Sequence, residues 1–448
     1  MIDARKQRVC RMCYSGGMGL KHIIALIAAC GVLGGGALYV VHRVTPEPDP
    51  QQLYHACVDG RWPDEDDAQS RAKVCSQALQ TLRLRPEEVA LARLTRGVAR
   101  TMLGNIVASF EDYQEALKHY DGAIDPTHPD ALPLFRRAIA EQGLGLADKA
   151  LADFDKAIGI DPRNQLAYLG RGTLLATRAR SYQRAIGDFN RTLELEPSNL
   201  NALVARGDAY SQLGEFQPAL ADLDRAVALA PGHAHPLVVR GVIHSREGKP
   251  ALALEDYDAA LRLNAKEPFA LMSRAALNAA DGKYGLAIRD LETSIEVNDQ
   301  NAMAYYNRGY AHFALGDYAA AISDYEAALK LDDNMGYAHL NRCLARVITA
   351  QAAKDDISGC DTALKLMPLS PDVRETRGFV FLKLGLTHRA IDEFEAALGI
   401  NANRAQALYG RALAECRLFR TEDCKRDKAA ALALEPNVEQ LYKRYGVD

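Results

Sequence analysis

Residues 301–333 read NAMAYYNRGYAHFALGDYAAAISDYEAALKLDD. Apolar residues recur in this stretch at intervals of three and four, which is the spacing of one face of an α-helix. The dipeptide Gly316-Asp317 interrupts the pattern near its middle and is typical of a turn. The stretch therefore predicts two amphipathic helices that fold back on one another as a hairpin.

The same pattern returns along most of the chain with a nearly constant period. An arginine followed by a small residue marks each copy. From Arg137 to Arg411 these marking arginines are 34 or 35 residues apart, whereas the first step is 41 residues because seven extra residues lie around Asn105–Gln114. A fixed period of this size indicates helical units that stack and bury a continuous core. The marking arginines are Arg96, Arg137, Arg171, Arg206, Arg240, Arg274, Arg308, Arg342, Arg377 and Arg411.

Small residues recur at two positions of each unit. Glycine, alanine or cysteine follows every marking arginine, as Gly309 follows Arg308. In most units an alanine such as Ala321 comes twelve or thirteen residues after that small residue. Small side chains at both positions would let the backbones of the two helices approach closely.

Each unit also has an aromatic or large apolar residue such as Tyr305 in its first helix, an aromatic such as Tyr325 in its second, and often a proline such as Pro197 at the junction. With these residues in this order, the units resemble tetratricopeptide repeats. The resemblance implies an all-α fold, an α-solenoid that winds as a right-handed superhelix of about eleven hairpins. It also implies that the inner face, lined by the first helices, binds peptides or partner domains. It carries over no catalytic residue.

We expect six segments along the chain, including one N-terminal transmembrane helix. They are an N-terminal tail (1–22), a transmembrane helix (23–41), a proline-rich acidic linker (42–51), a degenerate repeat (52–89), ten tetratricopeptide-like repeats (90–438) and a C-terminal tail (439–448).

The expected membrane anchor is the run Ile23–Val41, which has 19 residues and no charge. As a helix it would be about 28 Å long, close to the ~30 Å of a bilayer core. Basic residues precede it and a proline-rich acidic stretch follows, so the N-terminus is expected in the cytoplasm and the repeats outside it, in the periplasm if the chain is bacterial.

Three other interpretations of this run stay open. The same residues are also compatible with a cleaved signal peptide, with a lipoprotein signal ending at Cys30, and with a buried helix of the repeat domain. Met18 is an alternative start to Met1, which would keep the anchor and remove the basic tail.

An acidic residue follows most marking arginines 16 or 17 positions later. In an antiparallel hairpin these positions lie roughly opposite each other, and a planar guanidinium suits a half-buried carboxylate. We expect a ladder of ion pairs within or between units, the alternative being independent solvated charges. The pairs are Arg137/Asp153, Arg171/Asp188, Arg206/Asp222, Arg240/Asp256, Arg274/Asp290, Arg308/Asp324, Arg377/Glu393 and Arg411/Asp427.

Six of the nine cysteines fall into local couples, with one cysteine on each helix of a unit: Cys57/Cys75, Cys343/Cys360 and Cys416/Cys424. An even number in an exported region predicts three disulfides, the alternative being buried free thiols. In the unit that begins at residue 336, Gly359 replaces the acid of the ladder, so a disulfide there would replace the missing ion pair.

The register of the resemblance also gives the residues expected to line a partner-binding groove. They are apolar or aromatic in the middle of the array, which suits adaptable binding. The unit that begins at residue 200 offers a more polar set, including Asn201 and Asp208. The expected groove residues are Phe269, Met272, Met303, Tyr306, Tyr310, Phe313, Tyr337, Leu340 and Leu344.

These features predict a membrane-anchored scaffold or adaptor that binds partner peptides or domains and is not an enzyme. The alternative is an exported chaperone-like holder of hydrophobic segments. Lys+Arg is 54 and Asp+Glu is 58, so no global basic field favours nucleic acid. Neither a phosphate-binding glycine loop nor an HExxH or GxSxG motif occurs. We therefore expect no metal, no cofactor and no small-molecule substrate.

Overall fold

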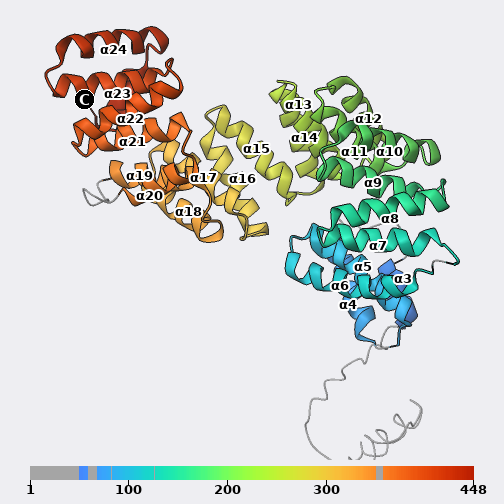
Figure 1. The fold of residues 1–448 in the computed structure, drawn as a ribbon. Coiled ribbons are helices and arrows are strands. Elements are labelled where there is room, and N and C mark those ends of the chain that lie inside the picture. Colours follow the sequence, from blue (N-terminus) through green and yellow to red (C-terminus); the bar gives the residue numbers. More distant parts are fainter. Residues whose placement is uncertain (1–49, 59–67, 82, 126, 350–356, 448) are drawn as a thin grey trace, which may run out of the picture. The chain divides into compact units, whose positions relative to one another are not determined.

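The computed structural model describes residues 50–58, 68–81, 83–125, 127–349 and 357–447, and these residues form helices and no strand (Figure 1). The predicted all-helical solenoid is confirmed for this part of the chain. The predicted N-terminal tail and transmembrane helix lie outside the described residues. None of the described helices is long and apolar enough to cross a membrane.

Ten consecutive hairpins each contain one marking arginine in their first helix. Their first helices are α5 (Pro86–Met102), α7 (Ala131–Gly143), α9 (Gln165–Thr177), α11 (Leu200–Gln212), α13 (Ala234–Arg246), α15 (Pro268–Ala280), α17 (Ala302–Leu315), α19 (Gly336–Ile348), α21 (Pro371–Lys383) and α23 (Ala405–Arg417). Their second helices are α6 (Ile106–Ala123), α8 (Ala147–Ile160), α10 (Tyr182–Leu195), α12 (Phe216–Leu229), α14 (Pro250–Leu263), α16 (Tyr284–Val297), α18 (Tyr318–Leu331), α20 (Ser358–Leu366), α22 (Thr387–Ile400) and α24 (Thr421–Leu434).

Three further helices flank these ten hairpins. An N-terminal hairpin of α3 (Pro50–Val58) and α4 (Ala68–Gln80) precedes them, and α25 (Val438–Arg444) follows them within the segment predicted as a tail. The seven extra residues of the first regular unit lengthen its helices: α5 has 17 residues and α6 has 18, whereas α17 and α18 have 14 each.

The hairpin of α17 and α18 shows why the quoted stretch folds as it does. The side chain of Asn301 accepts hydrogen bonds from the first turn of α17, and Asp317 does the same for α18. Gly316 ends α17 with a φ of 85°, a left-handed conformation that glycine adopts without steric cost. The sequence at the predicted turn therefore supplies both the end of one helix and the start of the next.

The small residue after each marking arginine lies where the two helices of a hairpin cross. A Cβ atom added to Gly309 would lie 2.9 Å from the ring of Tyr325, and one added to Gly241 would lie 2.6 Å from the ring of Tyr257. Such distances are shorter than a methyl group tolerates, so these crossings require glycine. The predicted close approach of the backbones is confirmed.

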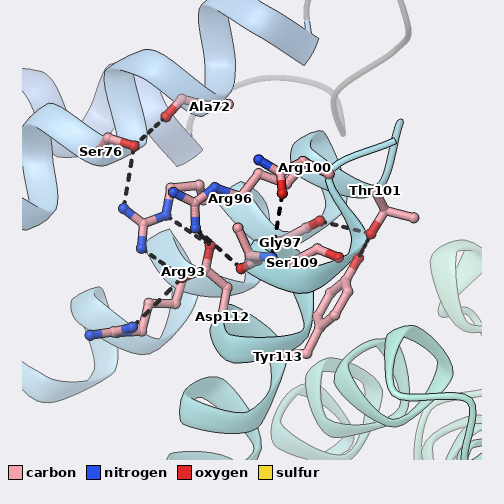
Figure 2. Close-up of polar contacts among 12 residues, drawn as sticks. Ala72, Ser76, Arg93, Arg96, Gly97, Arg100, Thr101, Ser109, Asp112 and Tyr113 are labelled. Carbon is pink, nitrogen blue, oxygen red and sulfur yellow. Dashed lines mark hydrogen bonds and ion pairs between the residues drawn. The ribbon is translucent and has the colours of Figure 1, made fainter. Parts of the chain in front are cut away.

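The predicted ladder is also confirmed, because the guanidinium of all eight pairs bonds the expected carboxylate. Figure 2 shows a ninth rung, in which the almost fully buried Asp112 accepts hydrogen bonds from Arg96 (2.6 and 2.8 Å) and Arg100 (2.8 Å). Several arginines bond the preceding hairpin as well: Arg137 to Asp121, Arg171 to Asp155, Arg240 to Asp224, Arg274 to Asp258 and Arg377 to Asp361. At these five junctions the ladder therefore ties a unit to its neighbour.

Candidate binding surface on the first helices

The first helices form the inner side of the stack. Each first helix from α5 to α21 contacts the next first helix along the chain, whereas no two second helices of the described hairpins contact each other. Side chains that leave the first helices on the side away from their hairpin partners therefore lie next to one another from unit to unit. We call this surface the inner face.

The period of the sequence arranges the inner face in columns. Because positions 34 residues apart are equivalent, each column takes one residue from every first helix. From α11 to α19 the first column is Asn201, His235, Phe269, Met303 and Tyr337, and the second is Val204, Val238, Met272, Tyr306 and Leu340. The third column begins with Ala205, Val239 and Ser273, and the fourth contains Asp208, Val242, Tyr310 and Leu344.

A concave pocket of about 420 Å³ lies on these columns between α11, α13 and α15. Most of its lining residues are apolar, and Asn201, Asp208, His235 and Ser273 add polar groups to the lining. This combination of an apolar surface with a few polar groups is typical of a ligand site. The remaining lining residues are Val204, Ala205, Val238, Val239, Val242 and Phe269.

The structure places the predicted groove residues one after another along the inner face. Phe269 and Met303 have 60% and 50% of their surface exposed, and Tyr310 and Tyr337 are also exposed. Met272, Tyr306, Phe313 and Leu344 are half-buried. Phe269 belongs to the pocket, so the pocket begins where the predicted groove ends and extends toward the unit that the sequence marks as polar.

Leu340 is a correction to the predicted groove. Only 2% of its surface is exposed, and it packs in the core with Cys343 and Val347. Leu340 belongs to the second column, in which Val204 and Val238 are buried as well. Side chains of this column point toward the neighbouring unit, so a short aliphatic residue there packs between units.

The tyrosines of α17 are held by contacts with neighbouring helices. The amide of Asn341 donates to the hydroxyl of Tyr306 at 3.4 Å, and the Tyr306 ring lies 5.9 Å from that of Tyr325. Burial raises the pKa of Tyr306, so its hydroxyl stays neutral and available for hydrogen bonding. Tyr310 lies beside Tyr284, with 6.5 Å between ring centroids. The aromatic part of the inner face is thus preorganised.

The chain's own C-terminus contacts part of this surface. Tyr445, which follows α25, has its ring 5.9 Å from that of Phe313 on α17. The sequence predicts a C-terminal tail over residues 439–448 and does not predict this contact. The one indication of it in the sequence is that residues 442–447, YKRYGV, are rich in aromatic and basic side chains.

The six paired cysteines lie in disulfide-compatible positions. The Cα atoms of Cys57 and Cys75 are 4.8 Å apart, those of Cys343 and Cys360 are 5.7 Å apart, and those of Cys416 and Cys424 are 5.3 Å apart. These separations are usual for disulfide-bonded pairs. Within the described residues, no group of three or more potential His, Cys, Asp or Glu ligands is placed to hold a metal ion.

Comparison with known families agrees with the repeat pattern. Residues 302–335 match one model of the tetratricopeptide repeat, and residues 135–199, 174–234, 204–268 and 238–291 match another. Residues 135–291 and 302–335 are therefore tetratricopeptide repeats, and the pocket lies within the first of these ranges. No curated protein matches the chain by sequence.

Several solved structures are similar to the chain at low sequence identity. The C-terminal part of a repeat-containing protein from Cytophaga hutchinsonii is 17% identical, with 54% of this chain and 98% of that one covered and a TM-score of 0.42. A tetratricopeptide repeat protein from Parabacteroides merdae is 20% identical (63% and 98% covered, TM-score 0.39). The APC/C hetero-tetramer Cut9–Hcn1 is 15% identical (90% and 97% covered, TM-score 0.46). These structures say nothing of what this chain binds.

Proposed function

We propose that the chain is a protein-interaction scaffold and that the inner face from α11 to α17 binds a peptide or helix of a partner protein. The observation that carries this proposal is the pocket between α11, α13 and α15, which continues into the exposed side chains of Phe269 and Met303. Contiguous apolar surface of this kind on a folded protein marks an interaction site.

The chemistry of the pocket suggests the chemistry of its partner. The half-buried Val239 and Val242 offer an apolar strip to side chains spaced three or four residues apart, which is the spacing of an amphipathic helix. The carboxylate of Asp208, exposed beside this strip, suits a basic residue next to the apolar ones. The partner segment is therefore expected to be apolar on one face with lysine or arginine beside it.

Site-specific photocrosslinking tests the proposal. A photoreactive residue at position 269 of the full chain is expected to capture one defined partner, and Phe269→Glu is expected to weaken binding of that partner. The matched control is position 252, because Leu252 on the second helix α14 is also an exposed apolar residue. Equal capture at both positions, or unchanged binding by Phe269→Glu, would contradict the proposal.

The same experiment separates a scaffold from a chaperone-like holder of hydrophobic segments. The exposed Phe269, Met303, Tyr310 and Tyr337 favour this second function, because large apolar side chains accept many sequences. A holder would give many unrelated crosslinked peptides at position 269, all rich in apolar residues. A scaffold would give one.

We further propose that residues 23–41 anchor the chain in a membrane with the repeats on the non-cytoplasmic side. The uncharged run, its basic N-terminal flank and the disulfide-compatible cysteine pairs support this arrangement. A reporter enzyme that is active only outside the cytoplasm, fused after residue 448, is expected to be active. Activity of a cytoplasm-specific reporter at the same position would overturn the topology.

A further inference from the structure

Residues 444–447, the last residue of α25 and the turn after it, are held against the inner face by three sets of contacts. The guanidinium of Arg444 donates to the carbonyl oxygen of Ala314, which lies 130 residues earlier at the end of α17. The ring of Tyr445 lies 5.9 Å from Phe313 of α17 and 5.7 Å from Phe379 of α21. The segment therefore bridges two first helices that do not contact each other directly.

Lys383 of α21 holds the backbone of the same segment. Its ammonium group donates to the carbonyl oxygens of Tyr445 at 2.7 Å and Gly446 at 2.9 Å. Gly446 has a φ of 69°, and a Cβ atom added there would lie 2.8 Å from Lys383 Nζ. Only glycine fits this position without strain or displacement of the lysine. The turn that caps α25 is thus contacted through both its side chains and its backbone, as a bound peptide is.

The part of the C-terminus that precedes this segment is anchored separately. Tyr442 is almost completely buried, and its hydroxyl donates to the carbonyl oxygen of Gln406 at 2.7 Å. It also packs against Tyr409 and Phe379. Because Tyr442 fixes α25, displacement of the residues after it breaks only the cap of the helix, which includes the bonds from Gly446 N–H to the Lys443 carbonyl and from Val447 N–H to the Tyr442 carbonyl. Displacement also exposes Val447, whose buried side chain is the apolar anchor of the segment.

We propose that the inner face between α17 and α21 is a second peptide-binding surface, which fits a partner segment with an arginine followed by a tyrosine and a glycine, and that residues 444–447 occupy it until such a segment displaces them. The inference goes beyond the scaffold function, because it concerns a different part of the inner face from the pocket between α11 and α15. It follows from the chain's own segment, whose contacts define what the surface recognises: an aromatic ring between Phe313 and Phe379, a guanidinium at Ala314 and two carbonyl groups at Lys383.

A tethered segment competes strongly with a free one. A short linker gives the segment an effective concentration on the order of mM at its site. A free peptide whose own dissociation constant is about 0.1 mM would therefore bind the intact chain at least about tenfold more weakly than a chain whose segment cannot compete. Tyr445→Ala removes the ring that contacts both helices and should open the surface.

The probe is a fluorescein-labelled peptide of residues 442–448, YKRYGVD, added to the full chain and followed by fluorescence anisotropy. We expect the Tyr445→Ala chain to bind it at least tenfold more tightly than the wild-type chain. The matched control is Lys443→Ala, since the Lys443 amine pairs with Glu439 on the same helix at 2.8 Å, and this variant should behave as the wild type. A probe with alanine in place of its second tyrosine should bind neither chain.

Equal binding of the probe by the wild-type and Tyr445→Ala chains would overturn the proposal. If Tyr445→Ala does not fold, Arg444→Ala removes only an exposed side chain from the contact and should still tighten binding of the probe; no change would count equally against the proposal. A wild-type dimer that becomes monomeric in Tyr445→Ala, detected by sedimentation, would show that a second copy's segment is the occupant instead. Phe269→Glu should leave binding of this probe unchanged, so failure here is distinguishable from failure of the scaffold proposal.

Discussion

The ion-pair ladder makes a quantitative prediction for Arg308→Ala. The guanidinium of Arg308 on α17 donates to both carboxylate oxygens of Asp324 on α18, at 2.9 and 2.6 Å. The side chain of Asp324 is only 7% exposed, and that of Arg308 is 22% exposed. Removing the arginine leaves a carboxylate with little access to water and without its principal partner.

The expected loss lies between two known limits. Breaking a buried ion pair by removal of one partner costs ~3–5 kcal/mol, whereas an exposed pair contributes about 0–1 kcal/mol. Because the arginine is about one-fifth exposed, water can partly solvate Asp324 after the substitution, and we expect a loss of about 2–3 kcal/mol. Arginine and alanine have similar helix propensities, so this loss belongs to the pair. For a cooperative block of repeats it corresponds to a fall in Tm of roughly 4–10 °C.

Urea and thermal unfolding of four chains form the assay: wild type, Arg308→Ala, Asp324→Ala and the double variant. The double variant should lose less than the sum of the two single losses, because no unpaired buried charge remains in it. Arg191→Ala is the matched control, since Arg191 pairs with Glu194 on the surface of a second helix, and its Tm should not change. An unchanged Tm in Arg308→Ala would show that the paired groups are solvated independently, and the ladder would then have no energetic role.

Three further predictions concern other parts of the chain. Burial and the nearby Asp153 raise the pKa of Glu141, so its carboxyl group binds a proton more tightly in the folded state than in the unfolded state. The contribution of this proton to the free energy of unfolding is present below the unfolded pKa of about 4.3 and is lost as the pH rises through the folded pKa. Glu141→Gln should therefore stabilise the chain more at pH 7 than at pH 4 in urea unfolding, and an equal gain at both would contradict this. The denatured chain should take up three alkyl groups per molecule before reduction and nine after it, as measured by mass spectrometry; nine before reduction would exclude the disulfides. Phe419 is 92% exposed and has a φ of 61°, at a turn where the preceding unit has Gly385 with a φ of 79°. Phe419→Gly should therefore increase the free energy of unfolding by about 1 kcal/mol and raise the Tm, whereas Phe419→Ala should not.

The sequence was sufficient for features that repeat. Gly309 and Tyr325 recur with the period, and only a hairpin crossing explains why a small residue and an aromatic keep a constant separation. Arg308 and Asp324 keep theirs for the same reason. Position in such an array follows from spacing, because each unit contacts only its neighbours and repeats their geometry.

Two kinds of feature could not be predicted from the repeat spacing: the direction in which a side chain points in the folded array, and contacts that occur only once in the chain. The register of the repeats predicts that Leu340 lines the groove, but its side chain is buried and packs against the neighbouring unit. The contact between Tyr445 and Phe313 occurs once and joins residues more than one hundred positions apart. No period predicts such a contact, since it requires knowing how far the end of the chain reaches across the inner face.

The hairpin of α19 and α20 shows how a disulfide replaces an ion pair of the ladder when a cysteine occupies the crossing position. The hairpin of α23 and α24, whose cysteines lie at other positions, keeps both the Arg411–Asp427 ion pair and the Cys416–Cys424 pair. Cys343 occupies the position of Gly309, and Gly359 occupies the position of the ladder's acid. A Cβ atom at Gly359 would lie 3.1 Å from the carbonyl oxygen of His339 and 3.4 Å from Cys343 Cβ, so there is little room for a carboxylate side chain. The close approach that brings Cys343 and Cys360 within disulfide reach therefore removes the space an ion pair needs. Asp361 still bonds Arg377 of the next unit, so the ladder between units continues past a hairpin whose own rung has been replaced.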